Sequence, residues 1–357
     1  MKKLLPIAKA RREYFGGIVL REHPAFLAYI NKEYADTYNI PEIKDVIFHE
    51  KIFTAPIDAH FTITTNCNMY CSGCYSTRKE DEPKNIPMDL AKTIIDKLSD
   101  LGVFSVSFGG GEPSLHPGIF ELADYTRKKN ILPNMTTNGL AMTSQLAVKY
   151  SIFGNVHFSI HKLQDLVHVL PACSMYHKTV KRNAGLNILI TSETLSHLDE
   201  ILHLAVKSKI KKVLFLRYKK TVKNIGIQEL DSENELIKLP ELFKKIMKKY
   251  WQIMFLFDCS LFELLAENNF SDIETYYKYD NNGCQGGNSW IAIDINGMYK
   301  PCSFWHESFG SILDLDFHRW IYNPQLNEFR NMKKKGACTR CGYDKLCNGG
   351  CRLFFNA

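Results

Sequence analysis

Three cysteines occupy one short stretch of the chain, CNMYCSGC, as Cys67, Cys71 and Cys74. A closed structural zinc site takes four protein ligands, and disulfides join cysteines in pairs. Three thiolates in one loop instead fit a metal cluster that keeps one corner open for another ligand. The fold of this chain must therefore hold three sulfur atoms together in a single loop.

Around this loop the chain alternates between short β-rich runs and amphipathic helical runs. Strands are predicted over residues 59–65, 103–109, 131–139, 156–161, 186–191 and 212–218. Helices are predicted over residues 88–102, 120–129, 142–150, 173–183 and 195–208. Each unit is too short for anything but parallel strands joined by right-handed crossovers. The pattern predicts a parallel sheet, either doubly wound or an open partial barrel.

Chemically distinctive residues follow the first four predicted strands. The cysteine loop follows the first strand, and GGGEP (109–113) follows the second. TTNG (136–139) and SIHK (159–162) follow the third and fourth. In both kinds of parallel sheet the loops after the strands meet at one edge and carry the chemistry. Glycines, thiolates and polar side chains on one rim predict a single site.

The combination of CxxxCxxC after a first strand and GGGEP after the second resembles the radical S-adenosylmethionine superfamily, over about residues 58–220. The resemblance implies a partial (β/α)6 TIM-type barrel. It also implies that Cys67, Cys71 and Cys74 bind a catalytic [4Fe–4S] cluster whose fourth iron is chelated by S-adenosylmethionine. Reductive cleavage of that sulfonium would give a 5′-deoxyadenosyl radical that abstracts hydrogen.

The resemblance also assigns residues to the S-adenosylmethionine site. Contacts to the methionine ammonium fall on Gly110, Gly111 and Glu112, and ribose and carboxylate contacts fall on Asn138 and Ser159. Arg217 is a candidate partner of the methionine carboxylate, with an ordinary surface ion pair as the alternative. One departure is Gly73, where the family commonly has an aromatic residue; Tyr70 and Tyr75 lie on either side of it.

A second group of six cysteines lies between residues 284 and 351. Cys284 and Cys302 flank a predicted β-hairpin with its turn at Asn296-Gly297. The stretch CTRCGYDKLCNGGC then supplies four more: Cys338, Cys341, Cys347 and Cys351. Taken alone, paired cysteines at this spacing are also typical of a zinc ribbon.

Together with the first half, this segment resembles the SPASM extension of peptide-modifying radical enzymes, over about residues 284–351. The resemblance implies one or two auxiliary [4Fe–4S] clusters. One would be held by Cys284, Cys302 and Cys351, and the other by Cys338, Cys341 and Cys347. The seventh cysteine of the family pattern has no counterpart here. Cys259 is either the fourth ligand of the first auxiliary cluster or a buried core cysteine, and Cys173 is predicted to be structural.

Three regions follow from these patterns. Residues 58–258 form the predicted barrel, and residues 259–357 form a small cysteine-rich, SPASM-like iron–sulfur domain. Residues 1–57 are predicted to be an N-terminal extension, a β-hairpin followed by a helix, packed on the barrel. This extension resembles the start of a peptide-recognition element, but it is too short to be the whole of one. The twelve histidines show no ligand spacing.

The composition indicates where the protein is located in the cell and which partners it lacks. The chain has 357 residues, 45% of them hydrophobic, and a net charge of only +7 with lysines spread along its length. This favours solvated helix faces over a nucleic-acid surface, and no segment fits a signal peptide or a membrane span. We expect a cytoplasmic protein without membrane or nucleic-acid partners, whose cysteines are not a disulfide framework. A reductant such as flavodoxin or ferredoxin would supply electrons.

The predicted function is that of an oxygen-sensitive radical S-adenosylmethionine oxidoreductase, or maturase, that abstracts hydrogen from a peptide or protein substrate. Modification of a small molecule or tetrapyrrole is a second enzymatic hypothesis. Anaerobic sulfatase-maturing enzymes are disfavoured, because their catalytic aspartate is replaced by Ser303 after Cys302. The non-enzymatic alternative is a zinc-ribbon protein that binds nucleic acid in a salt-dependent manner.

Overall fold

The structure is a computed structural model. It describes residues 7–22, 25–43, 52–69, 71, 74–76, 82–219, 233–267, 283–334, 339 and 349–355. Five residues singled out above lie outside the described residues: Tyr70, Gly73, Cys338, Cys341 and Cys347. No helix within the described ranges is long and apolar enough to span a bilayer.

The chain begins with a three-stranded antiparallel sheet in the order β1-β2-β3. Its strands are β1 (Lys9–Glu13), β2 (Gly16–Glu22) and β3 (Ala25–Asn31), and α1 (Lys32–Thr37) follows. The predicted hairpin therefore has a third strand. The helix begins where the Asn31 side chain accepts a hydrogen bond from the Tyr34 N–H at 3.0 Å, as capping residues do.

The N-terminal sheet is fixed to the rest of the molecule by a buried arginine. The Arg11 guanidinium donates to the carbonyls of Ala55 and Pro56, each at 2.7 Å, and forms an ion pair with Glu13. Burial lowers the pKa of Arg11, and the Glu13 carboxylate opposes that shift. Beside this contact a small apolar cluster joins Ile18 to Phe53, and it lies between the two sheets.

A second sheet of nine strands forms the body of the molecule, in the order β10-β9-β8-β7-β6-β5-β4-β11-β12. Every neighbouring pair from β10 to β11 is parallel. The strands are β4 (Asp58–Thr64), β5 (Ser105–Gly110), β6 (Leu132–Thr137), β7 (Val156–Ile160), β8 (Gly185–Ile190), β9 (Lys212–Arg217), β10 (Met254–Phe257), β11 (Trp290–Ile293) and β12 (Tyr299–Lys300). The six predicted strands are β4 to β9, so the partial (β/α)6 barrel is confirmed, and β10 extends it.

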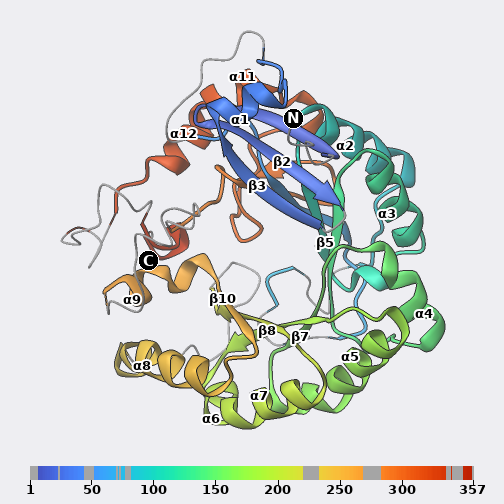
Figure 1. The fold of residues 1–357 in the computed structure, drawn as a ribbon, viewed down its shortest axis with the longest axis vertical. Coiled ribbons are helices and arrows are strands. Elements are labelled where there is room, and N and C mark those ends of the chain that lie inside the picture. Colours follow the sequence, from blue (N-terminus) through green and yellow to red (C-terminus); the bar gives the residue numbers. More distant parts are fainter. Residues whose placement is uncertain are drawn as a thin grey trace.

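Helices cover the outside of the curved sheet and leave its inner face toward the centre (Figure 1). The helices of this layer are α2 (Met88–Asp100), α3 (Ile119–Lys128), α4 (Ser144–Lys149), α5 (Leu166–Val180), α6 (Ser192–Ser196), α7 (Leu198–Lys207) and α8 (Glu233–Lys249). The helix predicted over 173–183 is α5, and it begins earlier because Leu166 and Val169 are also buried in the core.

The strand residues alternate between the two faces of the sheet, as the geometry of a strand requires. In β4, Ala59, Phe61 and Ile63 are buried in the large apolar cluster under the helices. Asp58 and His60 are only partly buried and lie on the other face. The core therefore fills the space between sheet and helices, and polar side chains line the inner face.

The C-terminal segment continues the same sheet. It contains β11 and β12, whose antiparallel pairing confirms the predicted hairpin, with Gly297 in the turn at φ 77°. Among the described residues this part also contains three helices, α9 (Phe262–Glu267), α11 (Phe317–Tyr322) and α12 (Pro324–Arg330), and the 3₁₀ turns η5 (Ile312–Asp314) and η7 (Arg352–Phe355). The Trp320 indole donates to the Phe53 carbonyl at 2.9 Å, which fixes α11 to the segment before β4.

Candidate functional site

The first three cysteines lie together in the loop after β4. Cys67, Cys71 and Cys74 are each partly buried. The Cys67 sulfur accepts from the Met69 N–H and the Cys74 sulfur from the Ser76 N–H, both at 3.4 Å. Backbone donors of this kind stabilise thiolates. The local backbone is thus suited to sulfur atoms that bind metal as anions.

Neighbouring thiols also raise the pKa of Cys71 and of Cys67. Burial raises the pKa of Cys71 to about 12, and the neighbouring Cys74 and Cys67 raise it further. Burial also raises the pKa of Cys67, with Glu112 and Cys74 adding to the effect. Three thiolates this close need a compensating positive charge, which iron would supply.

The glycine loop after β5 packs directly on the backbone that leads into Cys67. Gly110 has φ 114°, and a Cβ there would lie 2.2 Å from the Thr64 carbonyl oxygen. A Cβ on Gly111 would lie 2.2 Å from the Asn66 carbonyl oxygen. The Gly111 N–H donates to Thr64 and the Glu112 N–H to Asn66, both at 2.8 Å. Only glycine permits this approach, so the GGGEP loop positions the cysteine loop.

Glu112 is nearly inaccessible, with 1% of its surface exposed. Its Oε1 accepts from the Ser114 N–H and Oγ and from Thr137 Oγ1, at 3.1, 2.6 and 2.8 Å. Its Oε2 accepts from the Asn138 N–H at 2.8 Å. The carboxylate therefore joins the loops after β5 and β6, a role that the sequence did not predict.

The remaining candidate residues are Asn138, Ser159 and Arg217. Asn138 donates from Nδ2 to Asn68 Oδ1 at 2.7 Å, so the end of β6 contacts the cysteine loop. Ser159 lies partly buried in β7, two residues before the end of the SIH stretch. Arg217 instead donates to the Ser260 carbonyl at 3.1 Å, and its guanidinium lies 4.1 Å from the ring centre of Phe354. The structure thus places Arg217 against the C-terminal segment.

One residue beside the first thiols was missed by the sequence analysis. His161 Nδ1 lies 3.9 Å from the Cys71 sulfur, and the backbone N–H of His161 donates to the Asp165 carboxylate at 2.8 Å. Burial lowers the pKa of His161, and Asp165 opposes that shift. The signal was available, because His161 belongs to the SIHK stretch on the same rim.

Four other thiols converge from separate segments. Cys259 begins the 3₁₀ turn η4 (Cys259–Leu261), Cys284 and Cys302 flank the hairpin, and Cys351 precedes η7. Cys259 donates a hydrogen bond to the Cys284 sulfur, which lowers the pKa of Cys284 and raises that of Cys259. Burial raises the pKa of Cys302 to about 11 and that of Cys351 to about 12, with Cys284 adding to both.

Buried donors surround this second group, which we call the auxiliary thiols. Ser260 Oγ, Trp305 Nε1 and Arg352 Nη1 are buried without a hydrogen-bond partner among the described residues. Each follows an auxiliary thiol by one to three positions. An unsatisfied buried donor costs roughly 1–3 kcal/mol, and the sulfur atoms of an iron–sulfur cluster would accept such bonds. The donor set therefore fits a cluster.

Among the described residues, no three Cys, His, Asp or Glu side chains are spaced to hold a single metal ion. In a [4Fe–4S] cluster each thiolate binds a different iron. The ligands of a cluster therefore lie farther apart than the ligands of one ion, and the observed grouping is compatible with a cluster.

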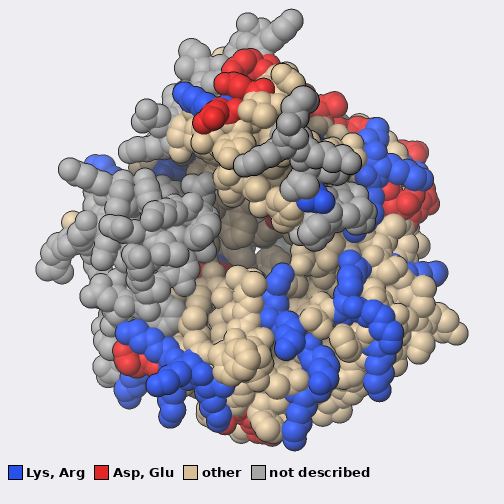
Figure 2. Space-filling model, in the orientation of Figure 1, with Lys and Arg blue, Asp and Glu red and all other residues tan. Residues whose placement is uncertain are grey.

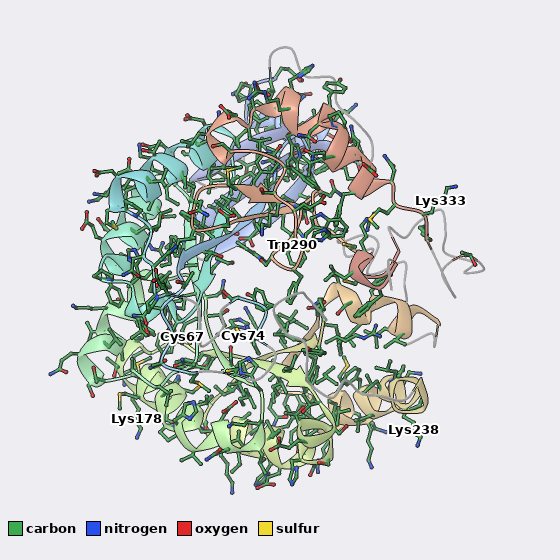
Figure 3. All side chains as sticks on the ribbon, turned by 180° about the vertical axis from the view of Figure 1, so that it is seen from behind. Cys67, Cys74, Lys178, Lys238, Trp290 and Lys333 are labelled. Carbon is green, nitrogen blue, oxygen red and sulfur yellow. The ribbon has the colours of Figure 1, made fainter. Side chains whose placement is uncertain are left out.

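The inner face of the barrel brings polar side chains to the same central space. His60 Nε2 lies 3.1 Å from Asp58 Oδ2, and its Nδ1 lies 3.4 Å from Ser303 Oγ. The Trp290 ring packs on His60 with centroids 4.8 Å apart. Figure 3 shows Trp290 facing the central space, with Cys67 and Cys74 on its other side. The space-filling view is hollowed at this point (Figure 2).

Comparisons with known proteins agree with these features. The sequence model of the Radical SAM superfamily matches residues 61–205, and that of the SPASM iron–sulfur cluster-binding domain matches residues 284–342. The chain therefore carries a radical S-adenosylmethionine domain followed by a SPASM domain. Enzymes of this class use S-adenosylmethionine, a [4Fe–4S] cluster and auxiliary iron–sulfur clusters.

The sequence identity to individual relatives is low. Mycofactocin maturase MftC of Mycolicibacterium smegmatis is 26% identical over 85% of this chain and 79% of its own length. An AdoMet-dependent heme synthase of Nitratidesulfovibrio vulgaris is 23% identical over 81% of this chain and 85% of its own. The structure of Streptococcus suis SuiB bound to the precursor peptide SuiA is similar in fold. It has a TM-score of 0.76 and 18% identity, and the match covers 98% of this chain and 95% of that one.

Proposed function

We propose that this enzyme modifies a peptide or protein side chain by hydrogen abstraction from carbon. The observation that carries the proposal is that the loops bearing the two groups of thiols meet. Tyr75, next to Cys74, packs on Phe304, two positions after Cys302, with ring centroids 4.4 Å apart. Two relatives support the substrate class. One is named a maturase, and the other was crystallised with a precursor peptide.

The first group of thiols would hold the cluster that binds S-adenosylmethionine. Bound there, S-adenosylmethionine supplies the radical that removes a hydrogen atom from the substrate. Gly110 and Gly111 allow the glycine loop to pack on the backbone that leads into the cysteine loop. Asn138 and Ser159 are proposed to bind the ribose and carboxylate, and Glu112 to bind the methionine ammonium while it holds the two loops together. Arg217 remains a proposed partner of the methionine carboxylate, and it also contacts Ser260 and Phe354 of the C-terminal segment.

The auxiliary thiols would hold one further cluster. Cys259 contacts Cys284, so we propose Cys259 as the fourth ligand with Cys284, Cys302 and Cys351. Such a cluster supplies an electron acceptor, or an electron relay, when bound. A second auxiliary cluster on Cys338, Cys341 and Cys347 remains a prediction, since these residues lie outside the described ranges.

The boundaries proposed for the three regions are residues 1–57, 58–258 and 259–357. The first boundary coincides with the start of β4 at Asp58, and the second with the start of η4 at Cys259. We further propose a cytoplasmic enzyme that is reduced by a flavodoxin or ferredoxin. Lysine and arginine side chains gather over the outer helices α5 to α8 (Figure 2), a surface suited to an acidic electron-transfer protein.

The experiment is an anaerobic assay of the purified, reconstituted protein with dithionite and S-adenosylmethionine. We expect a brown protein that bleaches in air and releases 5′-deoxyadenosine. A short peptide encoded next to the gene should then change mass in the presence of the enzyme. A protein that is colourless, or that makes no 5′-deoxyadenosine, would contradict the proposal.

Tetrapyrrole modification is the second candidate, and the heme synthase relative favours it. The same assay separates the two, with an iron porphyrin in place of the peptide. Turnover of the porphyrin and no change in the peptide would select this second function.

A further inference from the structure

A buried ion pair lies beside the auxiliary thiols. Lys219 follows β9 and Asp258 follows β10, and Lys219 Nζ lies 2.5 Å from Asp258 Oδ2. Their side chains are only 4% and 9% exposed. Asp258 directly precedes Cys259, and its Oδ1 accepts from the Ser260 N–H at 2.7 Å. Burying two charges carries a large desolvation cost, so this pair is a costly element to place next to metal ligands.

The two charges act on the thiols with opposite signs. Burial dominates the raised pKa of Cys302 and of Cys351, and the Lys219 ammonium opposes it in both. At Cys259 the hydrogen bond with Cys284 and burial raise the pKa, and the Asp258 carboxylate raises it further. Their positions agree with this: Asp258 adjoins Cys259 in the chain, and Lys219 Nζ lies 4.6 Å from the ring centre of Phe304, two positions after Cys302.

An aromatic pair covers the other side of the lysine. Lys219 Nζ lies 4.6 Å from the ring centre of Phe304. Phe304 in turn packs on Tyr75, with ring centroids 4.4 Å apart and planes inclined by 33°. Tyr75 follows Cys74, and Phe304 lies two positions after Cys302. The rings thus join the two metal-binding loops and keep water from the ammonium, which strengthens its field toward the auxiliary thiols.

A second buried cation completes the surroundings. Arg352, which follows Cys351, is 5% exposed and donates to the carbonyls of Phe329 and Arg330, both at 2.6 Å. Its charge helps to lower the pKa of Cys284, after the larger effect of the Cys259 hydrogen bond. Two cations and one carboxylate therefore stand beside four thiols among the described residues.

We propose that Lys219 and Asp258 are positioning residues that set the reduction potential of the auxiliary cluster, Lys219 raising it and Asp258 lowering it. Reduction adds one electron and no proton to a buried, negatively charged centre. A nearby cation stabilises the reduced form and a nearby carboxylate destabilises it. Because the cations outnumber the carboxylate, the site favours a cluster that accepts an electron. The inference rests on the proposed function, in which these four thiols hold a [4Fe–4S] cluster.

The test is a dithionite titration of the full-length, iron-loaded protein, followed by electron paramagnetic resonance. The Cys71→Ala protein shows which signal belongs to the auxiliary cluster. We expect Lys219→Met to shift the auxiliary midpoint potential to more negative values and Asp258→Asn to shift it to more positive values. Lys219→Arg keeps the charge and should stay near the native value.

Two controls sharpen the titration. The double variant Lys219→Met/Asp258→Asn should return toward the native potential, because both charges are gone. Lys129→Met removes a lysine from an exposed 2.6 Å ion pair with Asp96 on the outer helices, and should not shift the auxiliary potential. Should Lys219→Met lose iron, Asp258→Asn still tests the proposal through its opposite shift.

The inference is overturned if the native auxiliary signal is present and neither single variant shifts its potential, or if both shift it in the same direction. A different result would reject the proposed function itself. In that case the native protein would show no auxiliary signal, and Cys284→Ala would lose no iron.

Discussion

The two groups of thiols are built in different ways. Cys67, Cys71 and Cys74 come from one loop, are all partly buried, and are held by backbone groups of their own segment and of the glycine loop. The auxiliary thiols come from four segments up to ninety-two positions apart, from Cys259 to Cys351, and two of them, Cys284 and Cys351, are buried. The first group is a local feature of sequence, and the second exists only once the chain has folded. This difference predicts how each group responds to mutation.

The largest effect is expected from Cys71→Ala. Removing one of three ligands in the open loop should abolish 5′-deoxyadenosine formation, because no other described thiol belongs to that loop. The auxiliary iron should remain, since its ligands are elsewhere. Iron analysis and the cleavage assay, run on the same preparation, measure both. Cleavage near the native rate would show that the cluster assignment is wrong.

Cys259→Ala tests whether the auxiliary group has its fourth ligand in Cys259. We expect a loss of about four irons per chain, the content of one [4Fe–4S] cluster, with the first cluster retained. Cys173→Ala is the matched control, because Cys173 lies on the buried face of α5, in the apolar core. If the native protein and Cys259→Ala contained the same amount of iron per chain, Cys259 would not be a cluster ligand and would be a structural cysteine.

Gly111→Ala tests the support of the open loop by the glycine loop. A Cβ would meet the Asn66 carbonyl at 2.2 Å, so the backbone before Cys67 must move, and we expect cleavage of S-adenosylmethionine to fall by tenfold or more, equivalent to about 1.4 kcal/mol. Gly109→Ala is the control, because a Cβ there has nothing within 4 Å. Similar rates for the two variants would contradict this account of the loop.

Glu112→Gln should have the smallest effect of the four. The amide nitrogen cannot accept from the Ser114, Thr137 or Asn138 donors as the carboxylate does. A lost charge-assisted hydrogen bond costs about 1–2 kcal/mol, so S-adenosylmethionine should bind several-fold to about thirtyfold more weakly, with iron unchanged. Titration calorimetry measures the affinity. An unchanged affinity would leave Glu112 with its structural contacts alone.

The sequence predicted those features that depend on short-range spacing. The six barrel strands, the cysteine loop and the hairpin were readable because period and spacing are local properties. The third N-terminal strand was missed, because β3 and α1 lie in one run that reads as helical after the hairpin. The strand β10 was missed because its exposed residues Met254 and Leu256 obscure the pattern of a buried strand.

The parts of the site that were missed depend on tertiary contacts. His161 reaches Cys71 across ninety positions, and Lys219 reaches Asp258 across thirty-nine. The SIHK stretch placed His161 on the rim of the site, but a single sequence does not show which residues pair across it, because that is set by the order of the strands in the sheet. The role of Glu112 as an acceptor for four donors was hidden for the same reason: its partners lie on two different loops.

The pairing of β11 with β4 has a consequence for how the protein is made. Residues 290–293 lie beside residues 58–61 in parallel register, so the ribosome completes more than two hundred residues before β4 gains its neighbour on that side. Until then the nascent barrel carries an unpaired edge, which is a template for association with other chains. A protein shortened before β11 would keep that edge permanently. It would also leave the Phe53 N–H and carbonyl without Asn288 and Trp320. The SPASM segment thus covers one edge of the barrel sheet as well as carrying its own thiols.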